Sequence, residues 1–170
     1  MKKITLVLAF IGMITLQGCT RTDVVTNTIL SEVYELRNVN FGFNVNNGYT
    51  IYQTLNPQIS PSDVILIYRL SGTINPSTPI WQQIPRTLYL TQGELDYDFD
   101  FSREDFTIYA GGTYDLTSTP NYITNQTFRL VIIPGYASNR AAAKNVDYSD
   151  YNAVIHAFHL DNAKIKILNK

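Results

Sequence analysis

The segment GELDYDFDF places three carboxylates at alternate positions, Asp96, Asp98 and Asp100. Carboxylate oxygens are ligands that Ca²⁺ prefers, so a calcium site is the first chemistry to consider. An EF-hand loop would need glycine at its sixth position and glutamate at its twelfth, where this chain has Phe101 and Thr107. These aspartates are therefore weak candidates for a metal site, and they would need help from another strand or loop.

The same alternation is typical of a strand with one buried face. Side chains two residues apart on a strand lie about 6.6–6.8 Å apart, which is too wide for three carboxylates to meet on one ion. We therefore predict that the aspartates face water and that the intervening apolar side chains face the core. These apolar residues are Leu95, Tyr97, Phe99 and Phe101. The acidic row would also oppose edge-to-edge pairing between molecules.

A second group of possible metal ligands lies near the end of the chain, where His156 and His159 are the only histidines and Asp161 follows them. On a helix, residues i and i+3 share a face, and two histidines with a carboxylate are possible zinc ligands. The stronger spacing HExxH is absent. Two partly exposed histidines beside an apolar stripe are the simpler interpretation.

Catalytic motifs are missing from the sequence. The G-x-S-x-G, G-x-G-x-x-G and P-loop patterns do not occur, and neither histidine lies in a recognisable triad context. We expect no catalytic residue and no cofactor, although an unrecognised hydrolase remains an alternative.

The N-terminus indicates export. Lys2 and Lys3 precede an uncharged apolar run at residues 4–16, which is too short and wrongly flanked for a spanning helix and is typical of a signal peptide. The tetrapeptide LQGC then ends at Cys19, the only cysteine. It resembles the lipobox of bacterial lipoprotein precursors. The resemblance implies cleavage after Gly18 and attachment of lipid to Cys19.

Several expectations follow from this resemblance. Residues 1–18 would be a lipoprotein signal peptide, and residues 19–30, which are polar, would be a tether on the lipid. The length of the remaining chain, residues 31–170, suits a single domain. Two or more acyl chains hold a protein stably in a membrane. Thr20 stands where lipoproteins retained in the inner membrane often have aspartate, so the resemblance implies lipid anchoring in the outer membrane.

The net charge argues against nucleic acid as a partner. The chain has 13 basic and 14 acidic residues, and loss of Lys2 and Lys3 would leave 11 and 14, a net charge of −3. A basic patch or stripe is the usual footprint of nucleic-acid binding. The partners that remain are the membrane, through Cys19, and an envelope protein or a glycan.

The pattern after residue 30 predicts strand after strand. Apolar runs separated by turn residues indicate about eight to ten strands in an all-β, antiparallel sandwich, Ig-like or similar, with one short C-terminal helix. The predicted strands lie at residues 31–45, 49–55, 63–70, 80–90, 93–101, 105–116, 127–135 and 164–168, and residues 71–79 are predicted to be a loop.

Four local signals add detail. Asn-Gly at residues 47–48 predicts a hairpin with two positive φ angles. The continuous apolar runs in 63–70 and 127–135 predict central strands, whereas Pro85 predicts an edge strand or a bulge. The helical spacing in 149–160 predicts one amphipathic helix capped by Ser149.

The runs DVILIYRL, IWQQIPRTLYL, ELDYDFDF, QTFRLVIIP and DYNAVIHAFHL together resemble small uncharacterised lipoproteins of Gram-negative bacteria. Some of those carry the label dihydrolipoamide dehydrogenase, a chemistry that needs a glycine fingerprint and a redox-active cysteine pair. This chain has neither. The leading hypothesis is a lipid-anchored, non-enzymatic envelope protein of structural or protein-interaction type. The alternative is a surface module that binds glycan or calcium.

The lipobox makes a direct prediction. Replacing Cys19→Ala removes the atom that would carry the lipid, so the variant should lose labelling by radioactive palmitate and leave the membrane fraction. Both are measured by fractionating labelled cells. A variant that stays in the membrane and still takes up palmitate would refute the lipoprotein interpretation.

Overall fold

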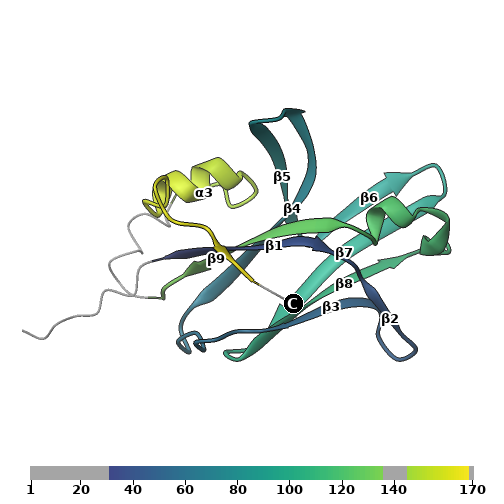
Figure 1. Ribbon diagram of the computed structural model, residues 1–170, viewed down its shortest axis with the longest axis horizontal. Coiled ribbons are helices and arrows are strands. Elements are labelled where there is room, and N and C mark those ends of the chain that lie inside the picture. The colour runs from purple at the N-terminus through teal and green to yellow at the C-terminus, as the bar shows by residue number, and fades with distance from the viewer. Residues whose placement is uncertain (1–30, 136–144, 169–170) are drawn as a thin grey trace, which may run out of the picture.

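The computed structural model describes residues 31–135 and 145–168, in which strands dominate (Figure 1). The strands are β1 (Glu32–Val39), β2 (Gly42–Asn44), β3 (Gly48–Thr54), β4 (Val64–Asn75), β5 (Thr78–Ile84), β6 (Arg86–Leu90), β7 (Gly93–Phe101), β8 (Asp105–Gly112), β9 (Gln126–Ile133) and β10 (Lys166–Ile167). Two short 3₁₀ helices, η1 (Leu116–Ser118) and η2 (Pro120–Tyr122), and one α-helix, α3 (Tyr151–Ala157), complete the described elements.

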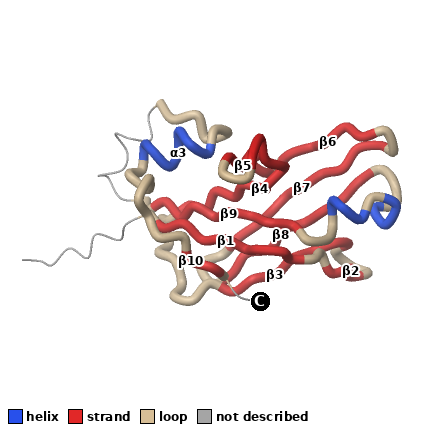
Figure 2. Tube along the Cα trace, turned by 45° about the horizontal axis from the view of Figure 1, so that its top comes forward, coloured by secondary structure: helices blue, strands red, loops and turns tan. Residues whose placement is uncertain are grey.

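The strands form two five-stranded sheets packed on each other. Sheet A has the order β10–β1–β9–β4–β5, and sheet B has the order β2–β3–β8–β7–β6. The prediction of a mostly β fold with one short helix near the C-terminus is confirmed. The prediction of a purely antiparallel fold is wrong, because β10 pairs in parallel with β1. The chain leaves β9, passes through α3 and reaches the far side of β1, a crossover that aligns β10 with β1 (Figure 2).

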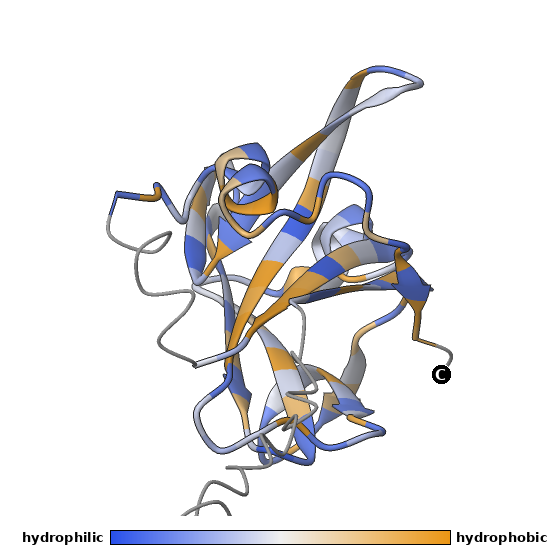
Figure 3. Ribbon diagram, turned by 90° about the vertical axis from the view of Figure 1, so that its left-hand side faces the viewer, coloured by the Kyte–Doolittle hydropathy of each residue, from blue (hydrophilic) through white to orange (hydrophobic). Residues whose placement is uncertain are grey.

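Strands β4 and β9 are central, as their apolar runs predict, and both of their faces are covered. On the inner face Ile67 and Phe128 are fully buried in the core between the sheets. On the outer face Tyr68 and Val131 are equally buried, and they pack against Val154 of α3. Figure 3 shows apolar residues recurring along the strands and on α3. Sheet A therefore lies between sheet B and a helical cover.

Pro85 marks the point where the chain changes sheets. The predicted strand 80–90 is divided there into β5, which ends at Ile84, and β6, which begins at Arg86. Each is the outermost strand of its own sheet. The prediction of an edge strand is confirmed. Proline cannot donate a hydrogen bond to a ladder, and it is tolerated here because it lies between two edge strands.

The predicted Asn-Gly hairpin forms, but with a longer loop. Asn44 pairs with Gly48, so three residues lie between the strands. Gly48 has a φ of +71°, whereas Asn47 does not have a positive φ. The side chain of Asn44 accepts a hydrogen bond from the backbone nitrogen of Asn46 at 2.8 Å, and this local bond replaces the expected tight turn. Phe43 and Val45 end up exposed.

Three other boundaries differ from the predictions. The predicted loop at residues 71–79 is instead the end of the β4–β5 hairpin, which projects from the body of the molecule (Figure 1). The strand predicted at residues 105–116 ends earlier, at Gly112, and η1 begins at Leu116. The helix begins at Tyr151 and is capped by Asp150 and not by Ser149, because the carboxylate of Asp150 accepts from two backbone nitrogens of the first turn.

The predicted signal peptide, Cys19 and the tether lie outside the described residues. Within residues 31–135 and 145–168, no helix has the length and apolar character needed to cross a membrane.

The core geometry predicts a sharp contrast between two substitutions. Phe128 is fully buried, with its ring 6.1 Å from that of Phe41 and 6.4 Å from that of Tyr97. Phe128→Ala should lower the free energy of unfolding by about 3–5 kcal/mol. Asp98→Ala, on the exposed face of β7, should change it by no more than about 0.5 kcal/mol. Urea unfolding measures both, and similar losses would contradict the packing.

Candidate functional site

The acidic strand β7 follows its predicted alternation only in part. Leu95 and Tyr97 are buried and Phe99 is half-buried against the core. Phe101 is 41% exposed, so the prediction that it faces the core is wrong. It is the last residue of β7, and its ring stacks 6.4 Å from that of Phe99 at the margin of the core.

The three aspartates lie on the exposed face and bind their neighbours. Asp96 accepts from the Thr87 hydroxyl at 2.5 Å, and Asp100 accepts from the Tyr109 hydroxyl at 2.8 Å. Asp98 accepts from the backbone nitrogen of Phe99. In the described part of the chain, no three His, Cys, Asp or Glu side chains are grouped to hold a metal ion. The structure therefore places the three aspartates on one face of β7, but it does not bring their carboxylates together at one site.

The two histidines do not share a helical face. His156 is in the last turn of α3, whereas His159 lies beyond the helix and has a φ of +57°. His156 Nδ1 is 3.6 Å from Asp161 Oδ1, and both side chains are exposed. The predicted i, i+3 geometry is wrong because α3 ends at Ala157, earlier than the sequence pattern indicates.

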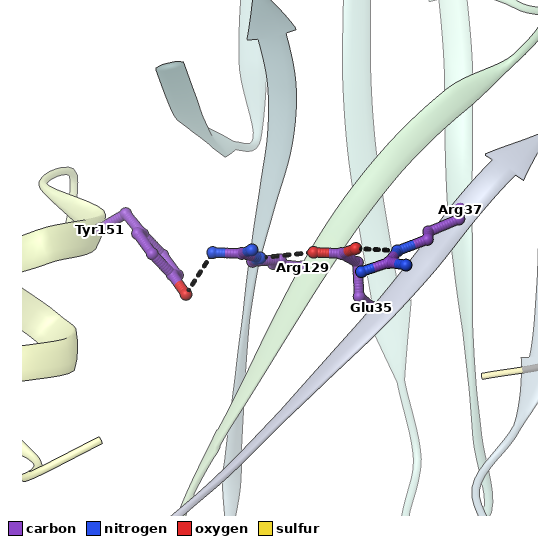
Figure 4. A network of polar contacts seen from close by, with 4 residues as sticks. All are labelled: Glu35, Arg37, Arg129 and Tyr151. Carbon is purple, nitrogen blue, oxygen red and sulfur yellow. Dashed lines mark hydrogen bonds and ion pairs between the residues drawn. The ribbon is translucent and has the colours of Figure 1, made fainter. Parts of the chain in front are cut away.

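Sheet A contains two arginines, Arg129 and Arg69, that were not among the candidates predicted from the sequence, and their surroundings differ. Arg129, on the outer face of β9, is paired with a carboxylate. Its Nε lies 2.6 Å from Glu35 Oε2, and its Nη1 donates to the hydroxyl of Tyr151 at 2.9 Å (Figure 4). Glu35 also accepts from Arg37, and the guanidinium of Arg129 lies 4.3 Å from the ring centre of Trp81. This network joins β1, β9, β5 and α3.

The carboxyl group of Glu35 is stabilised in its charged form. Burial alone would raise the pKa of Glu35, but the hydrogen bonds from Arg37 and Arg129 and the charges of both arginines outweigh burial and lower it. The negative charge balances Arg129 beneath α3. The chemistry of this network is therefore internal to the fold.

Arg69 is the contrasting case. It lies on the inner face of β4 and is only 7% exposed. Its Nε donates to Gln126 Oε1 at 2.8 Å, and its guanidinium carbon lies 4.9 Å from the ring centre of Tyr97 and 5.6 Å from that of Tyr122. No carboxylate of the described residues lies within 4 Å of it. Arg69 is thus a buried cation without a described counter-ion.

The partners of Arg69 are themselves fixed. The amide nitrogen of Gln126 donates to the backbone oxygens of Asn121 and Thr124, which turns Oε1 toward Arg69. The hydroxyl of Tyr97 donates to the backbone oxygen of Tyr122 at 2.7 Å. Burial raises the pKa of Tyr97 to about 12, so its ring is neutral at physiological pH. The guanidinium is therefore held in one orientation.

A cavity of about 410 Å³ beside the β2–β3 hairpin is mainly apolar, whereas the cavity of about 380 Å³ beside Arg69 is polar in part. The second one lies between the β4–β5 hairpin and β6, and we call it the Arg69 cleft. It is lined by Arg69, Ser71, Gln82, Arg86, Thr87, Leu88, Tyr89, Leu90 and Tyr122. Among the described side chains, only Trp81 Nε1 is both enclosed and without a hydrogen-bond partner. Arg69 lines the cleft, and besides Gln126 its guanidinium has a hydrogen-bonding interaction with the hydroxyl of Tyr97, which is itself uncharged.

A signal for both arginines was present in the sequence. Arg69 follows the apolar run VILIY, and Arg129 stands within TFRLVII. A charged residue inside a central strand must be paired or must face an opening, because burial of an isolated charge is costly. Which of the two applies depends on neighbours that are distant in the sequence, so only the fold separates Arg129 from Arg69.

Comparison with known proteins gives no further assignment: no protein-family model, curated protein or solved structure matches this chain.

The Glu35 network predicts a pH-dependent loss of stability. Because the folded-state pKa of Glu35 is lowered, its contribution is present above its unfolded pKa, about 4.3, and is lost as the pH falls through the folded value. Glu35→Gln should lower the free energy of unfolding by about 1–3 kcal/mol at pH 7. Urea titrations from pH 7 to pH 3 should show the difference from the unmodified protein shrinking below pH 4. A constant difference would contradict the charged pairing.

Proposed function

We propose that this chain is a lipid-anchored, non-enzymatic cell-envelope protein that binds an anionic group of an envelope component in the Arg69 cleft. Cys19 would hold it in the outer membrane, and an Ig-like sandwich would present the cleft. The observation that carries this proposal is the buried guanidinium of Arg69, which has no described carboxylate partner and reaches an open cavity.

The cost of burying a charge supports an anionic ligand. A cation removed from water is destabilising unless another charge or several hydrogen bonds compensate it. Arg129 illustrates the internal solution, since Glu35 neutralises it. Arg69 has one amide oxygen, the hydroxyl of Tyr97 and the faces of two aromatic rings, but no carboxylate. An anion that enters the cleft would supply the missing charge.

The lining of the cleft favours binding over catalysis. Its described residues include two arginines and two tyrosines but no carboxylate, histidine or cysteine. General acid–base catalysis usually relies on a side chain that exchanges a proton near neutral pH. Serine, glutamine and tyrosine are suited to hydrogen bonding, so the cleft is equipped to hold and orient a ligand.

The proposal predicts a stabilisation that depends on Arg69. The purified full chain is melted in sodium chloride, sodium acetate and sodium sulfate at matched ionic strength. A bound ligand at 100 times its dissociation constant stabilises by about 2.7 kcal/mol, which is several degrees in a domain of this size. We expect acetate or sulfate to raise the melting temperature above its value in chloride, and Arg69→Met to abolish that specific rise.

Two controls make the result decisive. Sulfate strengthens apolar burial in any protein, so the rise that remains in Arg69→Met measures this general effect. Lys164→Gln removes an exposed cation far from the cleft and should leave the anion response unchanged. Equal anion responses in the unmodified protein and in folded Arg69→Met would sink the proposed function.

A further inference from the structure

We infer that the anion recognised by the Arg69 cleft is the carboxylate of an acidic sugar, bound with its ring between β5 and β6. This inference rests on the proposed function and adds the chemical class of the ligand. It follows from the free edge of Arg69, from the neutral polar groups of the cleft and from its size.

The free edge of Arg69 suits a carboxylate. Its Nε is occupied by Gln126, so the N–H groups of the two terminal nitrogens that do not meet the Tyr97 hydroxyl are the donors that remain. They form one end of a planar fork, which can donate two parallel hydrogen bonds to the two oxygens of a carboxylate. The rings of Tyr97 and Tyr122 hold the plane of that fork.

The rest of the cleft suits a ring that carries hydroxyl groups. The amide of Gln82, which is half-buried, and the hydroxyl of Tyr122 form no hydrogen bond with any described residue. Both can therefore exchange hydrogen bonds with sugar hydroxyls. Leu88 and Leu90 add apolar side chains against which the C–H groups of a pyranose can pack.

The size and position of the cleft fit one sugar unit of a longer chain. About 380 Å³ lies at the low end of the range of ligand pockets, about 300–1,000 Å³. Both β5 and β6 are edge strands, so no further strand of either described sheet closes that side. Arg86, which is exposed, adds a second positive charge to the lining. A polysaccharide can thus place one acidic unit in the cleft and continue outside it.

Binding of defined probes to the full chain in detergent micelles tests this inference. Isothermal titration calorimetry compares sodium galacturonate and sodium glucuronate with galactose, glucose, sodium acetate, inorganic phosphate and trialanine. At least one uronate should bind about tenfold or more tightly than acetate and its neutral sugar. Arg69→Lys should weaken that uronate about tenfold, because lysine cannot make the paired hydrogen bonds. Gln82→Leu, which removes an amide assigned to the sugar hydroxyls, should weaken the uronate but not acetate, and Lys164→Gln should change neither.

The outcomes separate this inference from the proposed function. Equal binding of acetate and the uronates would overturn the sugar and leave an anion site. Preference for phosphate would overturn the carboxylate, and preference for trialanine would replace the sugar with a peptide terminus. Binding of uronates that is unchanged in Arg69→Lys would also overturn the inference. If no anion binds the unmodified protein, both the inference and the proposed function fail.

Discussion

Strands β4 and β9 bury side chains on both of their faces, so sheet A needs a cover on each side. Sheet B provides one cover through the core around Ile67 and Phe128. The chain after β9 provides the other, with Val154 and Phe158 of the helical segment packed against Tyr68 and Val131. Strand β9 ends at the end of the sheet where β1 begins, since Ile132 pairs with Glu32, and β10 starts near that same end on the far side of β1. Strand β10 therefore runs parallel to β1, and the connection that makes the sheet mixed also supplies the cover of its second face.

The burial of both faces also determines the surroundings of the arginine in each of these two strands. Successive side chains of a strand point to opposite faces, so Arg69 and Arg129 enter different environments although both stand in apolar runs. Arg129 points toward the helical cover and meets Glu35 and Tyr151. Arg69 points between the sheets, near the place where β5 and β6 separate at Pro85. Arg129 therefore helps to hold α3 on sheet A, whereas Arg69 lines the cleft that we propose as a ligand site.

Much of this architecture can be predicted from local patterns. Continuous apolar runs identified β4 and β9 as central, and Pro85 identified an edge, because burial and hydrogen-bonding capacity act at single positions. The β4–β5 projection was missed because residues 71–79 are rich in turn formers and lack a buried face, and only pairing with each other extends the two strands. The parallel partner of β1 and the lining of the Arg69 cleft join residues distant in the sequence. No local pattern encodes such encounters.

Strand β5 carries a tryptophan whose fluorescence depends on the packing of α3. Trp81 is the only tryptophan of the chain, and it packs under Arg129 and 5.6 Å from the ring centre of Tyr151. Indole emission responds to nearby charge and to water, so the fluorescence of this protein reports the seating of α3 on sheet A. The next residue, Gln82, faces the Arg69 cleft on the opposite side of the same strand. The one native tryptophan thus lies on the outer face of β5, directly behind the cleft on its inner face, and it can be followed without any introduced label.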